Sequence, residues 1–170
     1  MLALDESVRH FPSMGLAQQI YQFETALKSG GNHEVLRAEI IEAIYTDEMA
    51  PFYSKCCEKY GWEIDGAKVA SMSEANAKNL EDLETKIQDA IVNAGDTEVL
   101  DLMFAKAQHF CKIGGWAEAS AAYDAILAKE KTSTGKKIDA TMAQTRIAMF
   151  EMVRFWRRWL FLLSCENALS

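Results

Sequence analysis

A lysine-containing loop near the end of this 170-residue sequence is similar to part of a phosphate-binding motif. Residues 134–137 read Thr-Gly-Lys-Lys, like the last positions of a nucleotide-binding loop. That motif also needs a glycine five residues before its second glycine and a Ser or Thr after its lysine, and Glu130 and Lys137 occupy those positions. We therefore expect residues 132–135 to form a solvated loop between helices and predict no nucleotide site.

Two short patterns resemble the start of a zinc site and a redox pair. His33-Glu34 begins like the zinc-binding helix of a metalloprotease, but Arg37 stands where that helix needs its second histidine. Cys56 and Cys57 are adjacent, and a disulfide between neighbours would close a strained ring. Because neighbouring helical positions also point in different directions, we expect packed or half-exposed thiols.

The remaining reactive side chains do not form a catalytic pattern either. His109 and Cys111 lie two residues apart on an expected helix, so they do not converge on one metal ion. No pair among the four cysteines has CxxC spacing, which fits reduced thiols inside a cell. We predict no catalytic, cofactor-binding or metal-binding residues and no small-molecule substrate. A thiol or metal enzyme is the lesser alternative.

Composition narrows the class of protein further. Hydrophobic residues make up 49% of the sequence and charged residues 25%, which is ordinary for a folded globular protein. The 18 Lys and Arg against 25 Asp and Glu give a net charge of -7, which argues against nucleic acid as a partner, since phosphate binding needs clustered positive charge. The first ten residues lack the basic and apolar regions of a secretory signal.

Apolar residues recur at steps of three and four, as on the buried face of a helix, and no stretch alternates as a strand would. Glycines, prolines and capping residues divide the helices at Ser13, Gly30-Gly31, Asn32, Pro51, Gly61, Asp65 or Ser71, Gly95, Gly114-Gly115 and Thr132-Gly135. The residues expected to face inward are Leu16, Ile20, Phe23, Leu27, Leu36, Ile40, Ile44, Phe52, Cys56, Tyr60, Leu80, Leu83, Ile87, Ala90, Ile91, Leu100, Met103, Phe104, Ala107, Phe110, Cys111, Trp116, Ala119, Tyr123, Ile126 and Leu127. A further helical stretch is expected through Ile138, Met142, Thr145 and Met149.

Successive helices of this kind predict an all-α fold. We expect a right-handed stack of antiparallel helix pairs, because one pair cannot bury its apolar faces alone. Trp116, Ala119 and Tyr123 after a glycine pair resemble a tetratricopeptide repeat, although Lys106 and Lys131 depart from its pattern. The predicted divisions are a flexible amino terminus (1–12), a helical-repeat domain (13–150) and an atypical tail (151–170).

The tail combines arginine, tryptophan and leucine between Arg154 and Leu163. Its uninterrupted apolar run is far shorter than the roughly 18 residues that a membrane-spanning helix needs. A peripheral membrane protein that uses this segment as an interfacial anchor is therefore an alternative to a purely protein-binding function.

Several segments together resemble one protein family. They are Leu16-Ala17-Gln18, Met49-Ala50-Pro51-Phe52-Tyr53, Gly61-Trp62-Glu63-Ile64-Asp65, Met72, Ala75-Asn76, Ala105-Lys106-Ala107 and Phe110-Cys111-Lys112-Ile113-Gly114. From about Leu16 to about Phe150, the chain resembles the amino-terminal part of the family of 26S proteasome non-ATPase regulatory subunit 6, a PCI-class family of lid subunits. The paralogous signalosome subunit 1 is the nearest competing resemblance.

The resemblance implies a non-catalytic scaffold in the lid of the proteasome regulatory particle. Such a scaffold would support ubiquitin-dependent protein degradation through contacts with other lid and base subunits, in the cytoplasm and nucleus. The family continues into more helical repeats and a winged-helix PCI module, and we expect no winged helix here. The tail after Phe150 departs from the family pattern, as in a truncated or alternatively spliced form.

Overall fold

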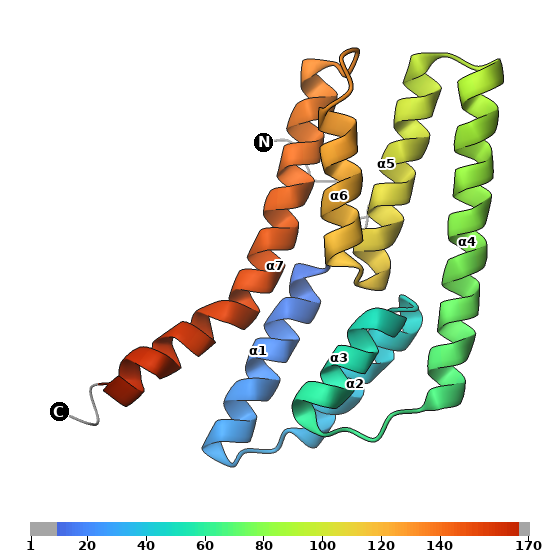
Figure 1. Ribbon diagram of the computed structural model, residues 1–170. Helices are drawn as coiled ribbons and strands as arrows, with labels where there is room; N and C mark the ends of the chain where they lie inside the picture. The colour runs from blue at the N-terminus through green and yellow to red at the C-terminus, as the bar shows by residue number, and fades with distance from the viewer. Residues whose placement is uncertain (1–9, 167–170) are drawn as a thin grey trace, which may run out of the picture.

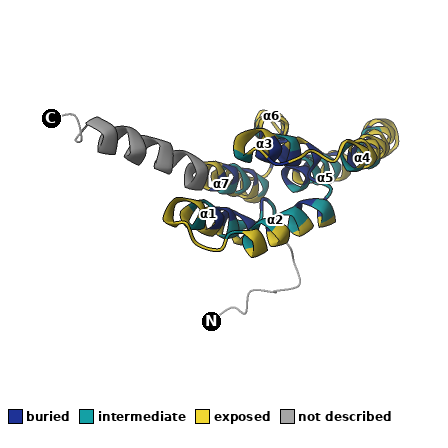
Figure 2. Ribbon diagram, turned by 90° about the horizontal axis from the view of Figure 1, so that it is seen from below, coloured by how far each residue is buried: buried dark blue, intermediate teal, exposed yellow. Residues whose placement is uncertain are grey.

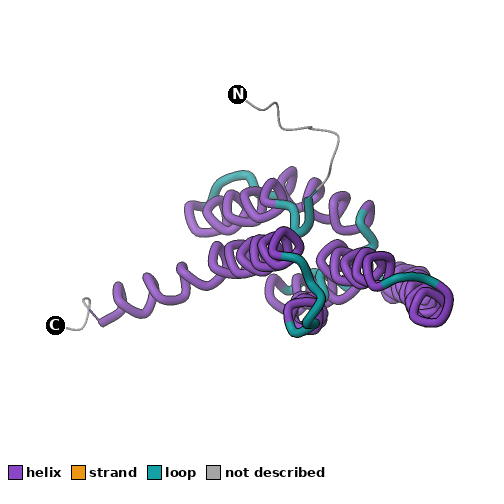
Figure 3. The backbone as a smooth tube through the Cα atoms, turned by 90° about the horizontal axis from the view of Figure 1, so that it is seen from above, coloured by secondary structure: helices purple, strands orange, loops and turns teal. Residues whose placement is uncertain are grey.

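The computed structural model describes the backbone of residues 10–166 and the side chains of residues 10–151. Within that part every regular element is an α-helix and no strand occurs, which confirms the all-α prediction (Figure 3). The helices are α1 (Met14–Ser29), α2 (Glu34–Thr46), α3 (Ala50–Tyr60), α4 (Gly66–Asn93), α5 (Asp96–Ile113), α6 (Trp116–Leu127) and α7 (Thr134–Glu166).

The starts of α1 and α4 follow from side chains that cap their first turns. The Ser13 hydroxyl accepts a hydrogen bond from the Leu16 N–H at 3.3 Å, and the Asp65 carboxylate accepts one from the Lys68 N–H at 2.9 Å. From Asp65, α4 runs without interruption to Asn93, so the alternative of a break near Ser71 is wrong. The helix has 28 residues, and it lies at one edge of the molecule (Figure 1).

The helices stack mainly on their neighbours in sequence, as expected for a helical solenoid. One group runs from α4 through α5 and α6 to α7, and the other contains α1, α2 and α3 (Figure 1). Contacts of α1 with α7, and of α3 with α4 and α5, join the two groups. Two helices distant in sequence, α1 and α7, therefore lie side by side.

The core lies where the two groups of helices meet, and aromatic rings fill much of it. Phe52 of α3 packs edge-on against Trp116 of α6 and Phe150 of α7, with ring centres 6.0 and 5.9 Å apart. A second aromatic cluster places Phe23 of α1 against Trp62, with ring centres 5.4 Å apart. Buried residues face this interior and exposed ones line the outside, most clearly on α4 (Figure 2).

Most residues predicted to face inward are buried or half-buried, but two helix ends differ. Leu27 is exposed because the buried face of α1 ends at Phe23, one turn earlier. Ile91 is exposed as well. It follows Ala90, which is buried, and adjacent helical positions are rotated by about 100°, so the two cannot face α5 together.

The helical stretch expected through Ile138 and Met149 is confirmed as α7, but these residues are not the ones that the helix buries. Ile138, Met142, Thr145 and Met149 all lie on the exposed side of α7. The buried side instead carries Ala140, Ile147 and Phe150, with the half-buried Ala143. Both sets have helical spacing, and the small alanines let α7 pack closely on its neighbours.

The structure does not test the predicted amino-terminal and carboxyl-terminal divisions, 1–12 and 151–170. Residues 1–9 and the side chains of the proposed membrane anchor, residues 154–163, lie outside the described part. Among the described residues, no helix combines the length and the apolar character needed to cross a bilayer. Among the first described residues, His10 and Phe11 line a groove together with residues of α4, α5, α6 and α7, and the Arg146 Nε donates a hydrogen bond to the Pro12 carbonyl at 2.9 Å.

Candidate protein-interaction surface

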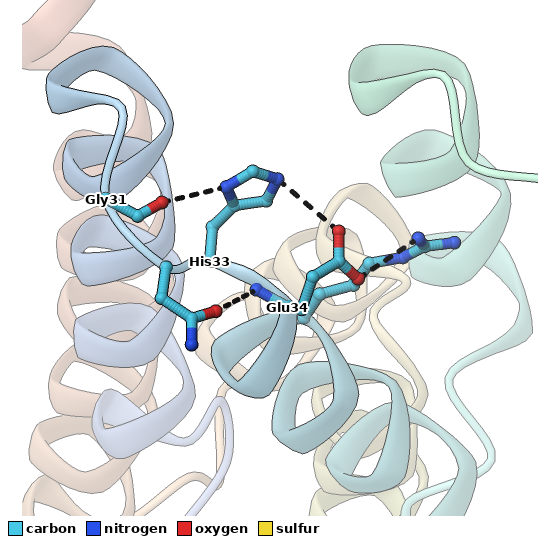
Figure 4. A network of polar contacts seen from close by, with 5 residues as sticks. Gly31, His33 and Glu34 are labelled. Atoms are coloured by element: carbon cyan, nitrogen blue, oxygen red, sulfur yellow. Dashed lines mark hydrogen bonds and ion pairs between the residues drawn. The ribbon is translucent and has the colours of Figure 1, made fainter.

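The His33-Glu34 pair forms a polar first turn at the start of α2 (Figure 4). The His33 Nδ1 lies 3.1 Å from the Gly31 carbonyl oxygen, and its Nε2 lies 3.5 Å from the Glu34 carboxylate. The Arg37 guanidinium lies 3.7 Å from the other oxygen of Glu34. The Asn32 side chain accepts a hydrogen bond from the Glu34 N–H, although His33 occupies the capping position itself. These groups therefore order the helix start and neutralise its carboxylate.

The described cysteines are packed rather than reactive. Cys56, Cys57 and Cys111 are all buried and free of disulfides. Burial raises the pKa of the Cys111 thiol to about 11, so the thiol keeps its proton at neutral pH. A protonated, buried thiol is a poor nucleophile and a poor metal ligand.

His109 lies two residues before Cys111 in the sequence, and the two side chains do not form one site. His109 is half-buried, and its Nε2 has no hydrogen-bond partner among the described residues. Burial lowers the pKa of His109, the nearby Lys112 lowers it further, and Glu48 opposes the shift. No group of three or more potential metal ligands occurs in the described part of the chain.

The loop that is similar to a phosphate-binding motif serves to join two helices. The Lys136 Nζ lies 2.6 Å from the Asp101 carboxylate of α5 and 5.0 Å from the centre of the Phe104 ring. The predicted solvated loop is partly wrong, since Thr134 begins α7 and Thr132 is buried with its hydroxyl donating to the Ile126 carbonyl at 2.8 Å.

A groove of about 860 Å³ lies between α4, α5, α6 and α7. Its floor includes Phe104 and Tyr123, which are buried, and its walls carry His109, Lys112 and Arg146. These residues come from helices that are distant in sequence, so sequence spacing alone could not bring them together. The groove has the size of a ligand cleft, but its titratable groups are spread along the walls rather than gathered at one point.

Exposed apolar side chains form a row along the outside of α7. Ile138, Met142 and Met149 are 58%, 65% and 52% exposed. Their spacing of four and seven residues places them on one face of the helix. A row of this kind on the surface is typical of a protein–protein contact rather than of a catalytic site. The sequence pattern identified these residues as part of a helix.

Sequence comparisons connect this helical stack to known proteins. The sequence model of the family described as 26S proteasome subunit RPN7 matches residues 65–152, just over half of the chain, from the cap of α4 into α7. The chain is 29% identical over 146 residues to 26S proteasome non-ATPase regulatory subunit 6 of Caenorhabditis elegans, covering 85% of this chain and 35% of that protein.

Two other relatives extend the likeness. The subunit of the same name in Dictyostelium discoideum is 29% identical over 150 residues, which are 88% of this chain and 38% of the relative. A homolog from Arabidopsis thaliana is 31% identical over 118 residues, which are 69% of this chain and 30% of the relative. The chain thus spans about a third of the length of these relatives. On the family match, the chain belongs to the 26S proteasome subunit RPN7 family.

Proposed function

We propose that the chain is a non-catalytic scaffold of the 26S proteasome regulatory particle and supports ubiquitin-dependent protein degradation through protein–protein contacts. The observation that carries this proposal is the family match over residues 65–152, which coincides with the stack from α4 to α7. Its partners are other lid and base subunits, and its location is the cytoplasm and nucleus.

The geometry supports contact rather than catalysis. The three described cysteines are buried, His33 orders a helix start, and Lys136 is paired with Asp101. In contrast, Met142 and its neighbours along α7 present apolar side chains to solvent inside the matched segment. Covering such a row with a partner subunit removes apolar surface from water, which stabilises an assembly.

Affinity purification tests the proposal. A tagged form of the full chain, expressed in cells, is expected to recover subunits of the regulatory particle, measured by quantitative mass spectrometry. Met142→Asp is expected to reduce that recovery by about tenfold, because a charge would then be buried in the contact. Thr141→Asp is the matched control, since Thr141 is also exposed on α7 but lies beside the apolar row.

Recovery of signalosome subunits, or of no proteasome subunit, would contradict the proposal. Equal losses from Met142→Asp and Thr141→Asp would contradict the assignment of the contact to the apolar row. Imaging of the tagged chain tests the location, and a signal confined to a membrane compartment would oppose it.

A further inference from the structure

The second helix has apolar residues on two sides, and the outer side is only partly covered. Ile40 and Ile44 of α2 are fully buried against α1 and α3. A second apolar strip runs along the outer side of the same helix and consists of Val35, Ala38, Ile41 and Tyr45. Apolar side chains that project from a helix toward solvent can be covered by a further helix, which removes their surface from water.

The outer strip of α2 is only partly open to solvent, because Ile41 and Tyr45 also pack against the core. Val35 is 59% exposed and Ala38 is exposed, whereas Ile41 and Tyr45 are half-buried. Ala38, Ile41 and Tyr45 line a shallow depression along the helix. The steps of three and four residues along the strip match the rows that one helix presents to another. Its shape therefore suits a helix laid along α2.

The charges beside the strip indicate which kind of partner helix would bind there. Glu42 lines the same depression and takes part in no ion pair within the described residues, and Glu39 is contacted only by the Gln19 amide at 3.3 Å. The cations nearby are already engaged. Arg37 pairs with Glu34 and stands over the Trp62 ring, and Lys68 stands over the Tyr45 ring at 5.0 Å. The face therefore carries uncompensated negative charge.

We propose that the outer face of α2 binds an amphipathic helix of a partner protein, with an apolar stripe on Val35, Ala38 and Ile41 and flanking Lys or Arg residues beside Glu39 and Glu42. This inference goes beyond the proposed function and does not depend on it, because α2 lies outside the segment matched by the family. Charge complementarity fixes the orientation and speeds the encounter, while apolar burial supplies the affinity.

Two designed peptides of about 18 residues provide the test, since shorter helices are marginal in water. Both carry the same leucine stripe, one with lysine flanks and one with glutamate flanks. Fluorescence anisotropy with the full chain is expected to show binding of the lysine peptide at least about tenfold tighter than of the glutamate peptide.

Two variants of the full chain localise the binding. Val35→Asp is expected to weaken the binding of the lysine peptide by about tenfold, because binding would bury an unpaired carboxylate. The substitution lies in the first turn of α2, where an acidic residue favours the helix, so the fold is retained. Glu42→Lys is expected to abolish the preference for the lysine peptide, whereas Glu81→Lys on the exposed face of α4 changes the net charge equally and preserves the preference.

Three results would overturn the proposal. They are unchanged binding to Val35→Asp, an unchanged peptide preference in Glu42→Lys, and dimerisation of the unaltered chain in sedimentation experiments that Val35→Asp abolishes. The last result would assign the face to a second copy of the chain. Circular dichroism of each variant establishes that the helices are intact, and none of these results bears on recovery of proteasome subunits through α7.

Discussion

At the scale of single residues, Gly114 connects α5 to α6 in a conformation that other residues rarely adopt. Its φ is +84°, and a Cβ atom at this position would lie 2.6 Å from the Cβ of Phe52. Gly61 ends α3 with a similar φ of +67°, but nothing lies within 4 Å of the corresponding Cβ. Substitutions at the two glycines therefore allow the cost of backbone strain to be separated from the cost of a steric clash.

We predict that Gly114→Ala lowers the free energy of unfolding by about 2–4 kcal/mol, since left-handed strain is added to a clash with Phe52 in the core. Gly61→Ala is expected to cost only the strain, about 1–2 kcal/mol. Urea denaturation of both variants measures the difference. Equal losses would mean that the turn relaxes away from Phe52 and that the close approach at Gly114 is not needed.

At the scale of elements, α7 shows what a sequence pattern can and cannot decide. Its existence follows from helical spacing, but Ile138, Met142 and Met149 form as regular a stripe as Ala140, Ile147 and Phe150. The choice between them depends on where Phe52 and Trp116 leave room for the Phe150 ring. That information lies in other helices, so a local pattern predicted the helix and not its orientation.

A pair of substitutions tests this orientation of α7. Ile147→Ala is expected to lower the free energy of unfolding by about 2–4 kcal/mol, because Ile147 is 5% exposed and its removal leaves a cavity. Met149→Ala, at a position that is 52% exposed, is expected to change it by less than about 0.5 kcal/mol. Thermal unfolding followed by circular dichroism compares them. The reverse order of effects would contradict the orientation of α7 in the structure.

The same limit applies to the candidate surfaces. Single residues such as His33, Cys56 and Lys136 could be judged from their neighbours in sequence, and the structure gives each a local structural role. The groove on α4 to α7 and the outer face of α2 could not be judged in that way. Both surfaces are defined by which helices lie beside them. Whether a row of apolar side chains is exposed depends on how the helices pack, which neighbouring positions in the sequence do not show.

At the scale of the whole molecule, contacts between distant helices modify the behaviour of a simple repeat array. In such an array each unit contacts only its neighbours, and unfolding can proceed unit by unit. Here α1 packs on α7, and Arg146 of α7 holds the carbonyl of Pro12 at the start of the chain. Phe52 of α3 also reaches Trp116 and Phe150. The helices therefore form one unit closed by its first and last members.

We predict a single cooperative unfolding transition, with coincident urea curves from tryptophan fluorescence and far-ultraviolet circular dichroism. Phe52→Ala is expected to lower the free energy of unfolding by about 3–5 kcal/mol with both probes, because one buried ring links three helices. Val92→Ala, at a position that is 80% exposed near the end of α4, is the control and is expected to leave both curves in place. Two separate transitions would contradict this prediction, and so would a Phe52→Ala effect seen with only one probe. Either result would mean that the contacts of α1 with α7 are too weak to join the two groups of helices. The stack would then unfold one helix pair at a time.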